Sequence, residues 1–394
     1  MKHRTRLFSL LAACALVLSL SACGDRDSAS LPSPSDTNPA APSGDAQPSP
    51  SSLLPDDFVP DTSVEDLCLA VAGVPGDFAL LTVNGAPVTA RSYLYWLTSN
   101  TSYVETYYGL TMDSGDWLAD YLKEESLTAA VQYHLIAAKA RELGYELTQE
   151  QQDELDGNLA LTAAMLGGEE AFADALRMSG LDYDTFYEIN AASYYYTLLQ
   201  EGLLADRPTA EEMDAYIEEN DLLYAKHILL MTVDPSTREP LDAETIAQKK
   251  ATAEDLLSQL QASSDLSGDF DALMNKYSED SGLSSNPDGY TFTAGEMVSE
   301  FETATRALEY GQLSSLVESP YGYHIILRLD PDTQANRSSL RADLLNEQLD
   351  AWTDEAELVL SEEYQALDPQ LVYEKYAAYQ QAFAAEEAAE PSEN

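Results

Sequence analysis

The sequence predicts an α+β protein in which a small domain with an antiparallel sheet is inserted into a mainly helical domain. Two runs rich in β-branched and apolar residues, 224–230 (YAKHILL) and 318–330 (ESPYGYHIILRLD), are typical of buried strands. Long segments with apolar residues at helical spacing lie before and after these runs. We therefore expect the two flanks to pack together as one helical domain, with the sheet domain inserted between them.

The strongly negative net charge argues against nucleic acid as a partner. The chain of 394 residues is long enough for two or more domains, and it has 20 Lys and Arg against 69 Asp and Glu, a formal net charge of −49. Such a field repels nucleic acid, so we expect no nucleic-acid binding, and it attracts cationic clients. The solvation of helix faces by acidic residues accounts for most of this charge.

The N-terminal segment is typical of a secretory signal. Basic residues precede Leu7–Leu20, an almost wholly apolar run that is too short to span a bilayer comfortably. The run leads into Ser21-Ala22-Cys23-Gly24, and this ending resembles the lipobox of bacterial lipoproteins. The resemblance implies that residues 1–22 are a signal peptide and that Cys23 carries the lipid anchor. The alternative is an ordinary cleaved signal with a chance cysteine.

Residues 23–60 are predicted to form a disordered tether. The segment is rich in Ser, Pro, Ala and Asp and shows no periodic apolar pattern, so it cannot bury enough apolar surface to fold. With a lipid at its start, the tether would lift the folded part off the membrane. We expect the protein at the extracytoplasmic face of a cell membrane.

Residues 61–222 are predicted to form the N-terminal part of the helical domain. A strand at 78–83 and a tight turn at Asn84-Gly85 come first, and Thr89 is a typical helix N-cap. Helical patterns then follow at 116–143, 148–166, 169–179, 183–204 and 209–220. The many tyrosines of this segment suit a surface that accepts varied peptides, and the alternative is that most of them are core or boundary residues.

Residues 332–394 are predicted to complete the helical domain and to end in an acidic tail. An apolar stripe predicts one helix over 337–365, and a second helix is expected over 369–390.

Residues 223–331 are predicted to form the sheet domain. The pattern indicates a strand at 224–231, a helix from about 242, a short helix at 270–277, a strand at 290–293, a helix at 297–308 and two closing strands. His227 and His324 lie in the predicted strands at the two ends of this domain in the sequence. A lone histidine in a strand is more often a core residue, and a metal site formed with Asp280 would have no recognised ligand spacing, so no metal is expected.

The motifs of this domain resemble those of the parvulins, a family of small peptidyl-prolyl isomerases. KHILL, YSEDSG, FTAGEMVSEF and ALEYGQLSSLVESPYGYHIILRL occur in order over about a hundred residues. With its lipoprotein signal and helical flanks, the whole chain resembles the secreted PrsA-type foldases and, more distantly, the SurA-type chaperones. The resemblance implies a parvulin-type isomerase domain that needs no cofactor, within a chaperone domain built from both flanks.

The resemblance also implies the residues of the site. His227 and His324 match the paired active-site histidines of the family. Asp280 occupies a position that is cysteine in some members and aspartate in many bacterial ones, and Ser319 matches a hydroxyl that bonds to one histidine. These four residues are the expected catalytic group.

The remaining positions concern substrate binding. Met297 and Phe301 match the apolar residues that hold the proline ring, and Tyr290 stands near a position that is usually leucine. The basic cluster by which some members read phosphoserine-proline is missing, because the loop 232–241 offers only Arg238. We therefore expect no phosphate-directed specificity.

The chemistry of X–Pro isomerisation suits these residues independently. Rotation disrupts amide resonance and meets a barrier of roughly 18–20 kcal/mol, which an enzyme can lower without a cofactor. An apolar slot would grip the proline ring, and a hydrogen-bond network would favour the twisted amide. Because a carboxylate is a weak nucleophile, Asp280 argues against a covalent mechanism.

Two functions from different classes follow. The first is a membrane-anchored foldase that isomerises X–Pro bonds in unfolded or partly folded secreted proteins. The alternative is a non-catalytic holdase whose parvulin domain only binds peptide. A cell-wall enzyme that uses Cys68 has no supporting motif, and the three cysteines Cys14, Cys23 and Cys68 form neither a disulfide framework nor a zinc spacing.

Overall fold

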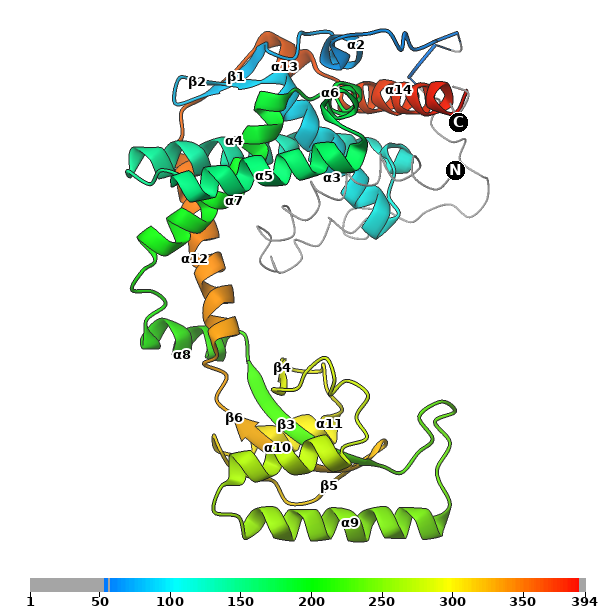
Figure 1. The fold of residues 1–394 in the computed structure, drawn as a ribbon, viewed down its shortest axis with the longest axis vertical. Coiled ribbons are helices and arrows are strands. Elements are labelled where there is room, and N and C mark those ends of the chain that lie inside the picture. Colours follow the sequence, from blue (N-terminus) through cyan, green and yellow to red (C-terminus); the bar gives the residue numbers. More distant parts are fainter. Residues whose placement is uncertain (1–52, 56, 390–394) are drawn as a thin grey trace, which may run out of the picture. The chain divides into compact units, whose positions relative to one another are not determined.

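The computed structural model describes residues 53–55 and 57–389 (Figure 1). The chain divides into two compact units. We call the described residues up to Ala205 and from Ala342 onward the host unit, and residues Asp206–Arg341 the inserted unit. The predicted signal peptide, Cys23 and the rest of the predicted tether up to residue 52 lie outside the described residues, as does residue 56.

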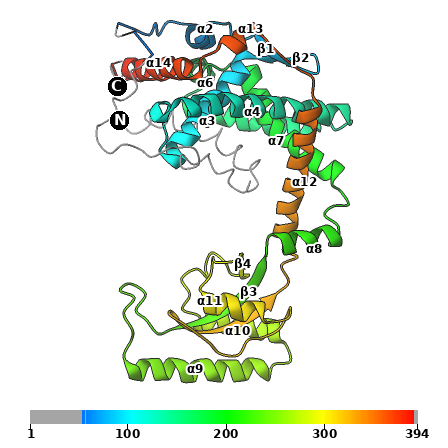
Figure 2. The same cartoon turned by 180° about the vertical axis from the view of Figure 1, so that it is seen from behind.

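The host unit is built mainly of helices. They are α2 (Leu67–Ala72), α3 (Ala90–Tyr108), η2 (Met112–Ser114), α4 (Asp116–Glu142), α5 (Gln149–Leu166), α6 (Glu169–Met178), α7 (Tyr183–Leu203), the end of α12 (Gln334–Glu355), α13 (Glu362–Ala366) and α14 (Pro369–Ala389). Side chains at the helix starts satisfy free backbone N–H groups, as Thr89 does for α3 and the Thr148–Gln151 capping box does for α5. Helices α3 and α4 pack against each other, as the view from behind shows (Figure 2).

A three-stranded sheet joins the two flanks of the chain within the host unit. Strands β1 (Ala79–Val83) and β2 (Ala86–Thr89) form a hairpin whose turn places Asn84 and Gly85 at positive φ. Strand β7 (Leu358–Leu360) pairs antiparallel with β1, with Leu81 opposite Leu360. Residues that are more than 270 positions apart therefore share one sheet, which confirms that both flanks build the same domain.

The predicted single helix over 337–365 is interrupted at 356–361, and its last residues belong to the separate helix α13. Helix α12 ends at Glu355, and residues 358–360 form β7 instead. Pairing with β1 decides this, because residues 358–360 form an antiparallel ladder with residues 81–83. Two further bonds join the ends of this ladder, since Asn84 N–H donates to the Glu357 carbonyl and Glu357 N–H donates to the Asn84 side chain. Pairing with a distant strand was not visible in the local apolar pattern.

The core of the host unit draws on both flanks. Leu97, Leu118, Leu199 and Leu345 are fully buried in one cluster, and Tyr364 and Phe383 from the C-terminal flank belong to it. Cys68 is also buried there, and burial raises the pKa of its thiol to about 12. The thiol is therefore protonated at neutral pH, which makes it an unsuitable nucleophile.

The inserted unit contains a four-stranded antiparallel sheet in the order β4-β3-β6-β5. Its strands are β3 (Leu223–Met231), β4 (Tyr290–Phe292), β5 (Val317–Ser319) and β6 (Gly322–Leu329), and its helices are α8 (Ala210–Glu219), α9 (Ala243–Gln261), α10 (Leu266–Tyr277), α11 (Ser299–Arg306) and the start of α12. Together with the helical host unit, this sheet confirms the predicted fold class.

The two faces of this sheet carry separate apolar clusters. Ile228, Ile325 and Leu327 pack with side chains of α9 and α10 on one face. Phe292, Ile326 and Phe301 of α11 form the cluster on the other face. Because side chains alternate along a strand, His227 and His324 lie on the α11 face.

Glycine is required at one point of this sheet. Gly322 lies opposite Met231 with φ 148°, and a Cβ atom at this position would collide with the carbonyl oxygen of Leu230. The start of β6 can therefore approach β3 closely only because residue 322 has no side chain.

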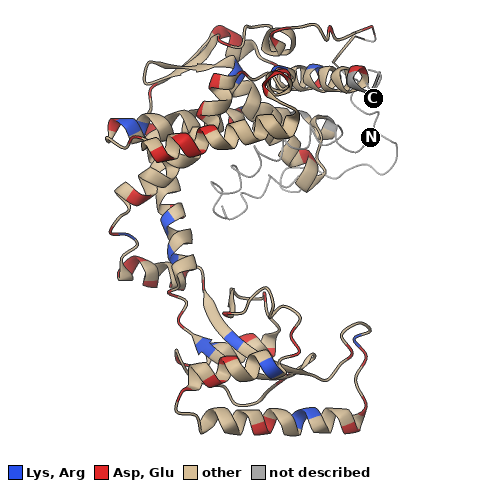
Figure 3. Ribbon diagram, viewed as in Figure 1, with Lys and Arg blue, Asp and Glu red and all other residues tan. Residues whose placement is uncertain are grey.

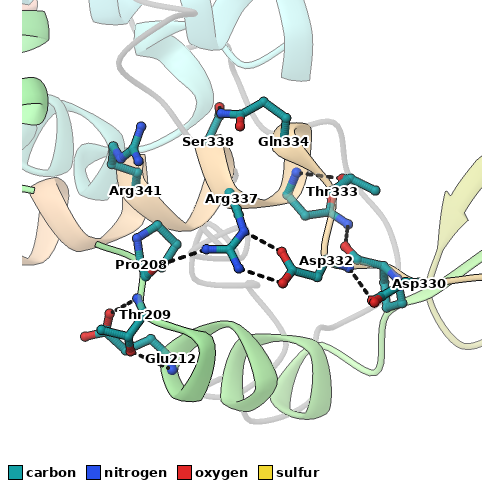
Figure 4. A network of polar contacts seen from close by, with 12 residues as sticks. Pro208, Thr209, Glu212, Asp330, Asp332, Thr333, Gln334, Arg337, Ser338 and Arg341 are labelled. Carbon is teal, nitrogen blue, oxygen red and sulfur yellow. Dashed lines mark hydrogen bonds and ion pairs between the residues drawn. The ribbon is translucent and has the colours of Figure 1, made fainter. Parts of the chain in front are cut away.

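Arginines tie the first and last segments of the inserted unit together (Figure 4). Arg337 forms a bidentate ion pair with Asp332, at 2.5 and 2.6 Å, and donates to the carbonyl of Pro208 at 3.0 Å. Arg341 donates to the carbonyl of Arg207 at 2.8 Å. The chain thus enters and leaves this unit through two segments that are hydrogen-bonded to each other.

None of the helices in the part of the chain that the structure describes is both long and apolar enough to cross a membrane.

Replacing Leu345 with alanine should lower the free energy of unfolding by about 2–5 kcal/mol, because it leaves a cavity in the shared core. Chemical denaturation followed by circular dichroism measures this change. The matched control is Leu161→Ala, at a leucine of α5 that is 60% exposed, which should change the value by less than about 0.5 kcal/mol. Equal effects of the two variants would contradict a core built from both flanks.

Candidate active site

The two histidines lie on the central strands of the inserted sheet. In the register of β3 and β6, His227 is opposite Ile326 and His324 is opposite Leu229, so the two side chains are diagonal neighbours on one face. Their Nδ1 atoms are 3.1 Å apart and their rings are stacked, with an interplanar angle of 13°. Both residues are buried, with 9% and 3% of their surface exposed.

Asp280 is held beside His227 by the loop that follows α10. The backbone N–H of Leu229 donates to the Ser278 hydroxyl, and Glu279 N–H donates to the Leu229 carbonyl. These bonds fasten the loop to β3 two residues after His227. The Asp280 Oδ2 atom consequently lies 3.0 Å from His227 Nε2.

Ser319 completes the line of polar groups on the other side. It ends β5, and its hydroxyl oxygen lies 2.7 Å from His324 Nε2. The backbone N–H of Tyr321 donates to the same oxygen at 3.1 Å. The four predicted catalytic residues therefore form one continuous chain of contacts, in the order Asp280, His227, His324, Ser319.

The pKa shifts of Asp280 and His324 limit which groups can donate hydrogen bonds in this network. Hydrogen bonds from His227, Tyr290 and Gly282 hold the pKa of the Asp280 carboxyl well below its usual range, so Asp280 only accepts. Burial, together with the nearby His227, lowers the pKa of His324 to about 3, so that ring is neutral.

If each ring carries a single proton, one proton arrangement satisfies every contact. His227 Nε2–H donates to Asp280, His324 Nδ1–H donates to His227 Nδ1, and the Ser319 hydroxyl donates to His324 Nε2. In this arrangement the network has a fixed polarity, running from the Ser319 hydroxyl to the Asp280 carboxylate.

Aromatic side chains form the apolar side of the site. The ring of Phe301 stands edge-on to both imidazoles, with centroids 5.1 Å from His227 and 5.6 Å from His324. Tyr290 packs edge-on to His227 at 5.7 Å, and Tyr290 and Met297 belong to the same apolar cluster as Phe301. The three predicted substrate-binding residues thus lie on one side of the histidine pair.

The prediction that Met297 lies on helix α11, together with Phe301, is wrong. Helix α11 begins at Ser299, after Val298 in an extended conformation, so Met297 precedes the helix instead of lying one turn before Phe301 on it. No side chain caps this helix start. Met297 nevertheless remains half-buried within the Phe301 cluster.

Two contributions to the site were missed by reasoning from the sequence. The backbone N–H of Gly282 donates to Asp280 Oδ1 at 3.1 Å, and the hydroxyl of Tyr290 donates to Asp280 Oδ2 at 2.5 Å. Tyr290 was predicted only as an apolar wall. The available signal was a tyrosine in the predicted apolar wall, because a partly buried hydroxyl requires a partner.

No group of three or more His, Cys, Asp or Glu that could hold a metal ion is found among the described residues. Cys68 lies in the host unit, and Cys23 lies outside the described residues.

Residues 227–330 match the family model described as Rotamase, a PPIC-type PPIASE domain. The chain is 32% identical over 225 residues to the foldase protein PrsA of Halalkalibacterium halodurans, which covers 55% of this chain and 60% of that protein. It is 31% identical over 197 residues to the foldase protein PrsA of Oceanobacillus iheyensis, which covers 49% of this chain and 56% of that protein. The chain thus spans 60% or less of the length of these relatives.

Among solved structures, the chain is similar to PrsA from Bacillus subtilis, with 21% identity, a TM-score of 0.25, and coverage of 67% of this chain and 86% of that one. The family match confirms that the inserted unit contains a domain of the peptidyl-prolyl isomerase type. The two sequence relatives confirm the resemblance to PrsA-type foldases.

The stability of the inserted unit should fall as the pH decreases from about 6.5 towards 3. In this window an unfolded chain takes up a proton at His324, whereas the folded site, where the pKa is about 3, does not. The folded state therefore binds fewer protons, and its free energy of unfolding decreases by up to about 1.4 kcal/mol per pH unit. Urea titrations at several pH values on the wild type and His324→Gln measure this slope, and two identical slopes would contradict a buried neutral imidazole.

Proposed function

We propose that the protein is a membrane-anchored, extracytoplasmic foldase. Its inserted unit catalyses cis–trans isomerisation of X–Pro bonds, and its host unit holds unfolded segments of secreted client proteins. The observation that carries this proposal is the continuous chain of contacts Asp280–His227–His324–Ser319 beside the aromatic ring of Phe301.

The site has the two parts that X–Pro isomerisation needs. Phe301, Met297 and Tyr290 provide an apolar surface against which a proline ring can be gripped. The hydrogen-bonded imidazoles beside them provide dipoles of fixed orientation, which stabilise the twisted amide relative to the planar one. Since the chemistry consists of rotation about one bond, no cofactor is required.

A non-covalent mechanism fits the residues of the site. The inserted unit contains no cysteine, since all three cysteines precede residue 69. Asp280 is ionised and already accepts three hydrogen bonds, from His227, Tyr290 and Gly282, so its oxygens are occupied. Its role is to orient His227 and to fix the direction of the proton chain.

The surface of the host unit supports a role in holding clients. Leu161 and Met165 are about 60% exposed one turn apart on α5, and residues 157–168 carry no charged side chain. Figure 3 shows acidic residues on the first half of α5 and none on the second half. At the end of α3, the exposed residues Tyr103, Tyr107 and Tyr108 cluster with ring centroids 4.7 and 6.1 Å apart.

Some tyrosines of the host unit are core residues and others are exposed, so both interpretations made from the sequence, core residues and a peptide-accepting surface, apply to part of them. Tyr93, Tyr95 and Tyr195 are buried core residues, whereas those at the end of α3 are exposed. Exposed aromatic and thioether side chains adapt to varied apolar segments. The net charge of −49 favours clients with basic residues and disfavours nucleic acid.

Attachment to the membrane is proposed through a lipid on Cys23. The support is the lipobox-like sequence that directly follows an apolar signal run.

The isomerase proposal predicts that the protein accelerates cis–trans exchange in unphosphorylated X–Pro peptides. His227→Ala and Asp280→Ala should each reduce kcat/KM by about tenfold or more, because each breaks a charge-assisted hydrogen bond in the chain. Tyr277→Phe, a change on α10 outside the four-residue chain, is the control and should retain activity. Peptide isomerisation is followed by a coupled protease assay.

No acceleration with any peptide, together with intact suppression of client aggregation, would contradict the isomerase and favour the holdase alternative.

The chaperone proposal predicts that the double variant Leu161→Asp/Met165→Asp suppresses aggregation of an unfolded basic client less well than the wild type, by about half or more. The reason is that it places charge on the uncharged second half of α5. Isomerisation of short peptides should not change. The control is Ser258→Asp/Gln259→Asp, which adds the same charge at exposed positions of α9. A similar loss in both double variants would show that net charge, not this face, is responsible.

A further inference from the structure

The hydroxyl of Tyr290 contacts the ionised end of the histidine chain. We propose that Tyr290 is a positioning residue for isomerisation, which fixes the carboxylate of Asp280 and through it His227, and that Gly282 leaves the space its hydroxyl needs. This inference rests on the proposed isomerase function of the same site.

The contacts to Asp280 leave its carboxylate one orientation. Tyr290 donates to Oδ2 at 2.5 Å, on the same oxygen that accepts from His227 Nε2 at 3.0 Å. The other oxygen, Oδ1, accepts from the backbone N–H of Gly282 at 3.1 Å. Rotation of the carboxylate would break bonds on both oxygens at once, so the direction in which Asp280 faces His227 is fixed.

The backbone sets the position of the tyrosine relative to the histidine. Tyr290 begins β4 and lies opposite Ala225, two residues before His227 on the same face of β3. Its ring stands edge-on to His227, with centroids 5.7 Å apart and an interplanar angle of 87°. Tyr290 thus touches both members of the Asp280–His227 pair, the first through its hydroxyl and the second through its ring.

Gly282 lies next to the Tyr290 hydroxyl, which occupies the space that a side chain at residue 282 would need. A Cβ atom added at residue 282 would meet the Tyr290 hydroxyl oxygen closer than any real Cβ contact. The next atoms, Tyr290 Cζ and Asp280 Oδ1, would lie at 3.4 and 3.5 Å, which is ordinary contact. Gly282 does not have a positive φ, so the backbone alone would accept alanine. A side chain at residue 282 would therefore displace the hydroxyl of Tyr290 from its present position.

The protonation of the pair maintains the direction of this hydrogen bond. Burial and the adjacent Asp280 raise the pKa of the Tyr290 phenol above its ordinary value, while the pKa of Asp280 is held low. The titratable groups that face Asp280 are His227 and Tyr290, with His324 beyond His227. Tyr290 stays a donor and Asp280 stays an acceptor throughout the neutral pH range.

Tyr290→Phe separates positioning from simple lining of the proline slot, because it keeps the ring and removes only the hydroxyl. The full-length variant should lose about tenfold in kcat with little change in KM, since His227 is no longer held by a fixed carboxylate. Tyr224→Phe is the matched control, because the Tyr224 hydroxyl donates to the carbonyl of Asp288 instead. Unchanged kcat in Tyr290→Phe would overturn the inference.

A double-mutant cycle tests the role of Gly282. Gly282→Ala keeps the N–H that bonds Asp280 but displaces the tyrosine hydroxyl, so alone it should reproduce the loss of kcat seen with Tyr290→Phe. The combined Gly282→Ala/Tyr290→Phe variant should be no worse than Tyr290→Phe, since the colliding atom is absent. Two losses that multiply would show that Gly282 acts independently of Tyr290, which contradicts the proposal.

A spectroscopic readout keeps this inference distinguishable from the proposed function. In nitrogen-15 spectra of the imidazoles, the His227 resonances should shift in Tyr290→Phe and in Gly282→Ala, and stay in place in Tyr224→Phe. Unchanged His227 resonances in the first two variants would overturn the positioning role whether or not the protein is active. An inactive wild type with the expected shifts would instead contradict the isomerase and leave the coupling of Tyr290 to His227 in place.

Discussion

The contact between the two Nδ1 atoms of His227 and His324 is the constraint on which the inserted unit depends. Two imidazoles can lie 3.1 Å apart in a buried place only if a single proton lies between these atoms. The two Nε2 atoms, on the outer side of each ring, then need hydrogen-bond partners of their own, one an acceptor and the other a donor. Asp280 supplies an acceptor at one end and Ser319 a donor at the other, so both the loop after α10 and the end of β5 must lie where they do.

The same contact explains why the chemistry is carried by a sheet. As diagonal neighbours on paired central strands, the two histidines are held by the continuous β3–β6 ladder, which gives the pair little freedom to separate. Helix α11 covers that face with Phe301, so the dipoles act next to an apolar surface. The host unit is built from both flanks through β1 and β7, so the sheet domain is an insertion between two described segments that share one core.

Features that depend on neighbouring residues could be predicted from the sequence, whereas features made by pairing between strands far apart in the chain could not. The histidine strands, the helix starts at Thr89, Thr148 and Thr209, and the Asn84-Gly85 turn were predictable, because each is written in a few neighbouring residues. Strand β7 was predicted as helix, since its partner β1 lies far away in the chain. The hydroxyl contact of Tyr290 was also missed, because the path of the loop that carries Asp280 is set by its bonds to β3.

The central claim is that the hydrogen-bonded histidine pair, next to Phe301, accelerates rotation about X–Pro bonds. The most direct measurement is two-dimensional exchange spectroscopy on an unphosphorylated Ala–Pro peptide, in which cis and trans resonances are observed at equilibrium with a small amount of full-length protein. The account predicts exchange cross-peaks with the wild type that are lost with His324→Leu, a variant that breaks the pair and keeps the site apolar. Wild-type cross-peaks as weak as those of the peptide alone, or equally strong with His324→Leu, would contradict it.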